Sequence, residues 1–219
     1  MLHVFDRHEL WKDSERDLIV ASLVQHGAFL ADPNHYRPRS NHGLEMDASL
    51  LALALAMPGI RYSGQWQKVA EERIDEYLRA NYSRRFVHLE QSPAYHLFVT
   101  IRLASVLRFL EANEFPVPAR LARVVAGAVA VWPYIRRPDG SAPMIGDTSA
   151  FPKPKDFEET HHRLLGRRPS SIAPEDRLNP RSDGSTAFVD VESGYALYSD
   201  HSPSPERKAD RRTFPVAVK

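Results

Sequence analysis

The chain has 219 residues, of which 42% are hydrophobic, and it contains no cysteine. The absence of thiols excludes a disulfide framework and cysteine-based zinc or iron–sulfur sites. The 29 basic residues nearly cancel the 28 acidic residues, which argues against a dedicated nucleic-acid-binding protein because such proteins carry a clear basic excess. The longest apolar run, residues 50–57, is far shorter than the ~20 residues of a membrane span. No signal peptide is visible at the N-terminus.

Helical spacing of apolar residues predicts five helices in the first two-thirds of the chain. Ser14 is expected to cap the first helix, and Ser92 followed by Pro93 is a strong start signal for the fourth. Pro58 and Gly59 are expected to end the second. The expected ranges are 14–31, 41–57, 63–81, 92–114 and 118–137.

The second expected helix is apolar almost all round after Asp47, which is typical of a buried inner helix. The third has one apolar stripe and one charged face, which indicates an outer helix. Because short connections make neighbouring helices antiparallel, the second and fourth should point the same way. Alternating inner and outer helices of this kind predict an incomplete α/α toroid in residues 1–165.

The remaining chain has a different amino-acid composition. Residues 138–154 are rich in proline, and a short polar helix is expected at 155–165. Residues 166–185 are expected to form a linker or surface loop. Two short strands are expected in the first part of 186–219, where a β domain begins. The fold class is therefore mainly α.

Unusual polar residues stand at the starts of the second and fourth helices, in the segments Ser40-Asn41-His42-Gly43 and Glu90-Gln91-Ser92-Pro93-Ala94-Tyr95-His96. Parallel helices would bring an amide, two imidazoles and a phenol near one another. The sequence contains no GxSxG elbow, P-loop, dinucleotide fingerprint or HExxH motif. The residue types that remain suit proton transfer without a metal or a nucleophilic serine.

These two segments, followed by Pro138-Asp139-Gly140 and by 143–147, occur in the same order as motifs of the heparinase II/III family, which includes alginate and oligoalginate lyases. The chain resembles this family over roughly residues 14–199. The resemblance implies an α/α toroid followed by an antiparallel β-sandwich, and cleavage of uronic-acid-containing polysaccharides by β-elimination. It also implies a bacterial, periplasmic protein whose partner is an acidic polysaccharide or oligosaccharide.

The family motif implies roles for single residues. Asn41 would hydrogen-bond the uronate carboxylate, and His42 would assist that binding or act as the base. Tyr95 would be the general acid and, as in some members, also the base. The sugar hydroxyls would be bound by Glu90 and Gln91, and the substrate also by His96. No cofactor is implied in this chain, although some members hold a structural zinc in the β-sandwich.

Each of these residues also has a structural interpretation. Asn41 could cap its helix, His42 could be hydrogen-bonded within its first turn, and Tyr95 could be an amphipathic core residue. His96 could simply orient Tyr95, and Glu90 could cap or pair with a nearby arginine.

The chain also departs from the family pattern. The stretch 83–88 lacks the Asp-Gly pair that often precedes the Glu-x-Ser-Pro motif, and the histidine that members supply from the β-sandwich has no clear counterpart. A fragment of a polyuronate lyase is therefore expected. Two alternatives are an inverting glycoside hydrolase that uses Glu90 and Asp147 as its carboxylate pair, and a non-catalytic acidic-glycan-binding protein. The sequence does not identify the polymer or the oligomeric state.

Overall fold

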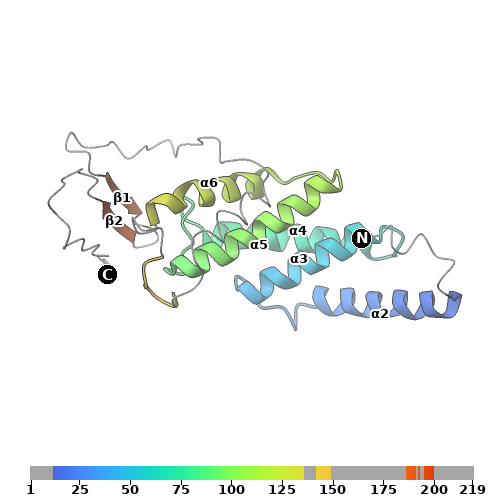
Figure 1. Cartoon of the computed structure of the whole chain (residues 1–219). Helices are drawn as coiled ribbons and strands as arrows, with labels where there is room; N and C mark the ends of the chain where they lie inside the picture. The colour runs from blue at the N-terminus through green and yellow to red at the C-terminus, as the bar shows by residue number, and fades with distance from the viewer. Residues whose placement is uncertain (1–11, 136–141, 149–185, 191, 193–194, 200–219) are drawn as a thin grey trace. The chain divides into compact units, whose positions relative to one another are not determined.

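The structure of the chain is a computed structural model that describes residues 12–135, 142–148, 186–190, 192 and 195–199. The chain divides into two compact units, residues 1–80 and 81–219, which we call the N-terminal unit and the C-terminal unit. The mainly helical fold predicted from the sequence is confirmed (Figure 1). No helix within the described ranges is long and apolar enough to cross a bilayer.

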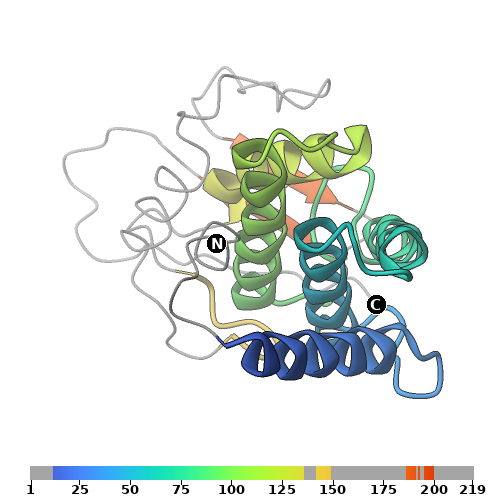
Figure 2. The same ribbon diagram turned by 90° about the vertical axis from the view of Figure 1, so that its right-hand side faces the viewer.

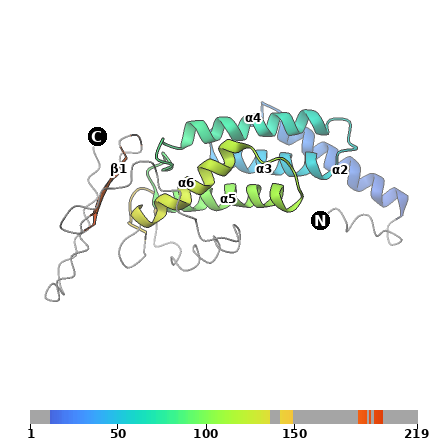
Figure 3. The same cartoon turned by 90° about the horizontal axis from the view of Figure 1, so that it is seen from above.

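The N-terminal unit contains the helices α2 (Asp13–Ala31), α3 (Asn41–Ala56) and α4 (Ser63–Asn81). Figure 2 shows α2 crossing one end of α3. Contacts between the start of α3 and the end of α4, and between the middle of each, show that these two helices run antiparallel (Figure 3). This is the arrangement that the short connection at residues 57–62 predicts.

The start of α2 differs from the prediction. Ser14 lies inside the helix, and the N-cap is Lys12. The backbone N–H of Lys12 donates to the Glu15 carboxylate at 2.9 Å, so the acidic side chain of the first turn satisfies a donor at the cap and the helix begins earlier. Part of the apolar surface of α2 stays exposed, with Leu18 at 72% and Phe29 at 53%.

The helices α3 and α4 have the predicted burial. In α3 the buried side chains include Asp47 as well as apolar residues, and in α4 they include Trp66 and Tyr77. The acidic and basic residues that fill the outer face of α4 are mostly exposed. Gly43, in the first turn of α3, allows the preceding loop to pass close by, because a Cβ atom there would lie 2.1 Å from the carbonyl oxygen of Arg37.

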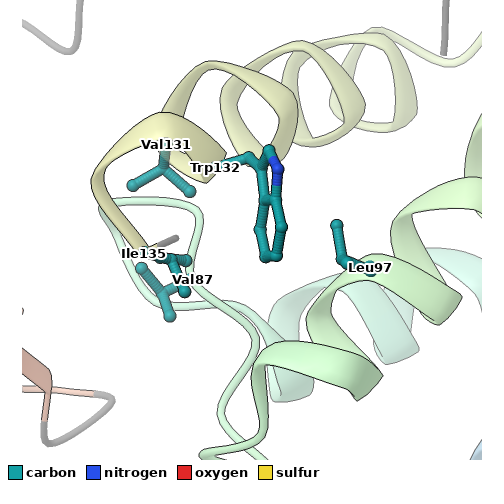
Figure 4. Packing of buried hydrophobic residues seen from close by; sticks show 5 residues of the cluster. All are labelled: Val87, Leu97, Val131, Trp132 and Ile135. Atoms are coloured by element: carbon teal, nitrogen blue, oxygen red, sulfur yellow. The ribbon is translucent and has the colours of Figure 1, made fainter. Parts of the chain in front are cut away.

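The C-terminal unit contains α5 (Pro93–Ala112) and α6 (Ala119–Ile135), which pack against each other, and the strands β1 (Thr186–Asp190) and β2 (Tyr195–Ser199). A buried cluster joins α5 and α6 to the segment that precedes α5 (Figure 4); it consists of Val87, Leu97, Val131, Trp132 and Ile135. Both predicted strands are present, and they form an antiparallel pair. The expected helix at 155–165 and the expected linker at 166–185 lie outside the described residues.

The segment before α5 has an irregular backbone. Phe86 adopts a left-handed conformation with φ of 63°, and only an isolated antiparallel bridge joins Tyr82 to His88. A Cβ atom on Gly127 would lie 2.2 Å from Cγ of Phe86. The ring of Phe86 therefore lies directly on the backbone of α6, and this packing compensates for the unfavourable backbone conformation.

Candidate functional site

The polar segments at the starts of α3 and α5 share one local design. Ser40 is the N-cap of α3, and its Oγ accepts the backbone N–H of Gly43 at 3.0 Å. Ser92 is the N-cap of α5, and its Oγ accepts the backbone N–H of Tyr95 at 3.3 Å. In both helices a serine satisfies the third backbone N–H. The side chains of Asn41 and Tyr95 therefore lie in the first turn without serving as caps.

Asn41 is half-buried at the first position of α3, so its interpretation as a capping residue is wrong. Its carboxamide oxygen accepts a hydrogen bond of 2.9 Å from the hydroxyl of Tyr77 on α4. An asparagine side chain offers two N–H donors besides this acceptor. The arrangement can present an uncharged double donor at the N-terminal end of α3. His42, the next residue, is exposed.

A buried ionisable group, Asp47, lies further along the same helix as Asn41. Asp47 is fully buried, and its Oδ1 lies 3.6 Å from Nη1 of Arg73 on α4. Its Oδ2 accepts the hydroxyl of Tyr36 at 3.0 Å. Burial raises the pKa of Asp47 to about 7, although Tyr36 and Arg73 both act in the opposite direction.

Arg73 also connects α4 to the end of α2. Its guanidinium donates to the carbonyl oxygens of Leu30 at 2.9 Å and Ala31 at 3.0 Å, and its Cζ lies 3.8 Å from the centre of the Tyr36 ring. We call Tyr36, Asp47 and Arg73 the buried ionic cluster. This cluster ties the loop that leads to Asn41 to the helices α3 and α4.

In the C-terminal unit, the loop at 142–148 completes the start of α5. The Thr148 Oγ1 lies 3.0 Å from Oγ of Ser92 and accepts the backbone N–H of Ala94 at 3.1 Å. Gln91 precedes the cap in a left-handed conformation with φ of 57°, which costs roughly 1–2 kcal/mol in a residue other than glycine. Such strain is concentrated at functional sites in proteins, and here it sets the turn from which α5 begins.

The exposed surface at this end of α5 carries most of the other predicted residues. Glu90, Gln91 and Asp147 are exposed, and Tyr95 is half-buried. The ring of Tyr95 meets Phe98, one turn further along, edge to face at a centroid distance of 6.3 Å. These residues can be reached by a ligand, which is what a substrate-contacting role requires.

His96 differs from its neighbours because only 1% of it is exposed. Its Nε2 lies 2.9 Å from the carbonyl oxygen of Ala128 on α6, and its Nδ1 accepts the backbone N–H of His88 at 3.2 Å. A carbonyl can only accept, so Nε2 carries the proton and the ring is neutral. Both ring nitrogens are thus used internally, so the geometry favours a structural role, in which His96 links α6 to the segment before α5, over direct contact with substrate; no hydrogen bond from this ring to Tyr95 is found among the described residues.

Burial also lowers the pKa of His96 to about 4. The unfolded chain binds this proton near pH 6.5. Between about pH 6.5 and 4 the unfolded state therefore holds more protons, and the contribution of His96 to stability is lost as the pH falls. For His96 alone this loss is on the order of 3 kcal/mol over the window, and urea denaturation of the wild-type chain and of a variant without this imidazole measures it.

A His96→Gln variant should lose less stability over the same window than the wild-type chain. His26→Gln, at an exposed histidine of the same chain, is the control for the substitution itself. If the free energy of unfolding fell equally with pH in the wild-type and His96→Gln chains, the buried neutral state of the His96 ring would be contradicted. The comparison between variants is needed because two other groups titrate in this range. Asp47, whose pKa is raised, makes a contribution of opposite sign between about pH 4 and 7, and the buried His88, whose pKa burial lowers to about 3, makes one of the same sign as His96.

The predicted residues fall into two groups. Asn41 and His42 lie in the N-terminal unit, whereas Glu90, Gln91, Tyr95 and His96 lie in the C-terminal unit. Their convergence on one substrate stays a prediction. Within the described residues there is no group of three or more His, Asp or Glu side chains that could hold a metal ion.

Tyr77 belongs to the single apolar stripe predicted for the third helix, but no sequence pattern marks the role of its hydroxyl or singles out Arg73 or Thr148. The sequence does contain a signal for a partner such as Arg73. A carboxylate at the start of an apolar run within a helix, such as Asp47, demands a partner, because an unpaired buried charge is very costly.

Comparison with known proteins decides the family. Residues 2–162 match the heparinase II/III N-terminus family. The chain is a member of this family. No curated protein matches it at a significant level.

Two solved structures resemble this heparinase II/III family member, and both are of the heparan sulfate lyase HepC from Pedobacter heparinus. A mutant of that lyase has 18% sequence identity and a TM-score of 0.59, and the lyase itself has 19% identity and a TM-score of 0.57. In each case the similarity covers 86% of this chain and 32% of the other. The chain thus spans about a third of the length of these lyases, and the likeness supports its mainly helical fold.

Proposed function

We propose that this chain acts as part of a polysaccharide lyase that cleaves uronic-acid-containing glycans by β-elimination. Membership of the heparinase II/III family supports the lyase class. The observation that carries the proposal is the local design shared by α3 and α5. In each, a serine caps the helix and leaves a chemically active side chain, Asn41 or Tyr95, in the first turn.

The chemistry assigned to Asn41 follows from the substrate. The C5 proton of a uronate is a weak acid because the neighbouring carboxylate is already negative. Hydrogen bonds from the Asn41 amide to that carboxylate would stabilise the charge that develops when the proton leaves. The positive end of the α3 dipole acts in the same direction.

The elimination then needs one base and one acid. A base, His42 or Tyr95, takes the C5 proton, and the electrons of the C5–H bond form the C4–C5 double bond. The C4–O4 bond breaks, and Tyr95 gives a proton to the departing O4. The products are an unsaturated uronate at the new non-reducing end and a free hydroxyl on the other sugar. Tyr95 is half-buried and borders the exposed residues Glu90 and Gln91, which would bind sugar hydroxyls.

The test is a panel of heparan sulfate, alginate and hyaluronan, incubated with the 219-residue chain. We expect at least one polymer to give a product with new absorbance in the low ultraviolet, because the double bond is conjugated with the carboxylate. New reducing ends without absorbance would overturn the lyase and support the inverting hydrolase with Glu90 and Asp147. Binding without any product would support an acidic-glycan-binding protein.

One observation keeps the hydrolase as a second candidate. Thr148 holds the loop that carries Asp147 against the first turn of α5, and Glu90 precedes that turn. Both carboxylates are exposed. An inverting pair needs a separation of about 6.5–9.5 Å, and the product assay distinguishes this candidate directly.

A further inference from the structure

The carboxamide of Asn41 has two ends with different surroundings. Its oxygen accepts the Tyr77 hydroxyl at 2.9 Å. Within the part of the chain that the structure describes, its nitrogen donates no hydrogen bond. The ends of an amide differ in what they can do, since the oxygen accepts and the nitrogen donates. A partner that engages one end therefore decides which chemistry the other end offers.

Tyr77 is the residue that engages the oxygen end of the Asn41 amide. Only 2% of it is exposed, although its hydroxyl still reaches the start of α3. A phenolic O–H is a donor of moderate acidity, and a carbonyl oxygen is its natural acceptor. Rotating the Asn41 amide by half a turn would break this bond, and the phenol oxygen would then have to accept a hydrogen bond from an Asn41 N–H. In the observed bond Tyr77 donates and the Asn41 oxygen accepts, so the Asn41 N–H groups are directed away from the Tyr77 hydroxyl.

The position of the Tyr77 ring is itself fixed by neighbouring contacts between α4 and the chain around α3. On one side, Nε of Arg39 donates to the Glu76 carboxylate at 3.1 Å. Deeper in the unit, Arg73 faces the fully buried Asp47. These contacts hold the register of the two antiparallel helices, so the hydroxyl of Tyr77 stays opposite the side chain of Asn41.

We propose that Tyr77 is a positioning residue, which holds the Asn41 carboxamide so that its N–H groups face the carboxylate of the substrate. This inference rests on the proposed function for the role of the substrate. The contact between Tyr77 and Asn41 does not depend on it. Tyr77 touches no substrate in this proposal and acts only through Asn41.

The first test observes the contact without turnover. With selective ¹⁵N labelling of asparagine, the Asn41 side-chain amide signals are assigned by their disappearance in Asn41→Ala. We expect Tyr77→Phe to shift these signals. Tyr82→Phe is the matched control, because it removes another buried phenol hydroxyl, one that lies 3.3 Å from Thr100. Unchanged Asn41 signals in Tyr77→Phe would overturn the proposal.

The second test measures the consequence for catalysis with a double-mutant cycle. Tyr77→Phe should lower kcat about tenfold in the wild-type chain, as expected for loss of one orienting hydrogen bond. It should have no further effect in the Asn41→Ala background. Equal fractional losses in the two backgrounds would show a merely structural role and overturn the proposal. If the wild-type chain forms no unsaturated product, the proposed function fails, and the amide signals still decide whether Tyr77 holds Asn41.

Discussion

Replacing Tyr95 by phenylalanine is expected to reduce lyase activity by about 10²- to 10⁴-fold, the usual contribution of a general acid or base. The substitution removes only the hydroxyl that would protonate the departing O4. The readout is the rate at which low-ultraviolet absorbance appears on the best substrate of the panel.

The fold should survive this change for two reasons. The N-cap of α5 uses the backbone N–H of Tyr95, which phenylalanine retains. The edge-to-face contact with Phe98 involves the ring alone. We therefore expect the thermal midpoint to stay within about 2 °C, the range of a substitution that removes no buried partner.

The matched control is Tyr62→Phe, which removes a hydroxyl from an exposed tyrosine in the connection before α4. This variant should keep its full activity. If Tyr95→Phe retains most of its activity, Tyr95 is not the acid, and its side chain only packs at the start of α5. A loss of activity that matches a loss of folded protein would point the same way.

Local signals in the sequence were sufficient for most helix boundaries. Ser92 and Pro93 predicted the start of α5, because capping and the fixed φ of proline act within a few residues. The start of α3 was predicted equally well. The start of α2 was misplaced because Ser14 resembles a cap, whereas the Glu15 carboxylate satisfies an earlier N–H.

Contacts between helices could not be predicted in the same way. Tyr77 falls on the apolar stripe of α4, and it is indeed buried. The partner of its hydroxyl depends on the register of α4 against α3, which no local pattern encodes. The same holds for His96. Its sequence position allows either substrate contact or an internal role, and only the placement of Ala128 and His88 around the ring separates the two.

Asp47 shows what the sequence could have indicated. A carboxylate directly before an apolar run of a buried helix implies a partner of opposite charge. The sequence does not say which of the many arginines supplies it, and the structure identifies Arg73. The pairing supports the helix that carries Asn41, which is the residue to which the proposed function assigns the uronate carboxylate.

Replacing Arg73 by methionine is expected to cost about 3–5 kcal/mol in the free energy of unfolding at pH 8, the usual result of removing one partner of a buried ion pair. Asp47 would be left fully buried without its counter-charge, and the carbonyl oxygens of Leu30 and Ala31 would lose their donors. Urea denaturation measures this loss. The matched control on the same helix is Arg79→Met, which removes an exposed ion pair with Asp75 and should cost only about 0.3–0.5 kcal/mol.

The cost of Arg73→Met should also depend on pH. Arg73 lowers the pKa of Asp47, which burial raises to about 7, so the variant should raise it further. Well below pH 7 the carboxyl is protonated in both folded chains, and the variant then loses only the other contacts of Arg73. Above pH 7 the wild-type carboxylate is ionised beside its partner, while the variant must bury an unpaired charge or hold a proton. The difference in unfolding free energy should therefore grow as the pH rises from 5 to 8. A constant difference would show that Arg73 stabilises the unit through its hydrogen bonds to α2 and its contact with Tyr36, and that its charge opposite Asp47 contributes nothing.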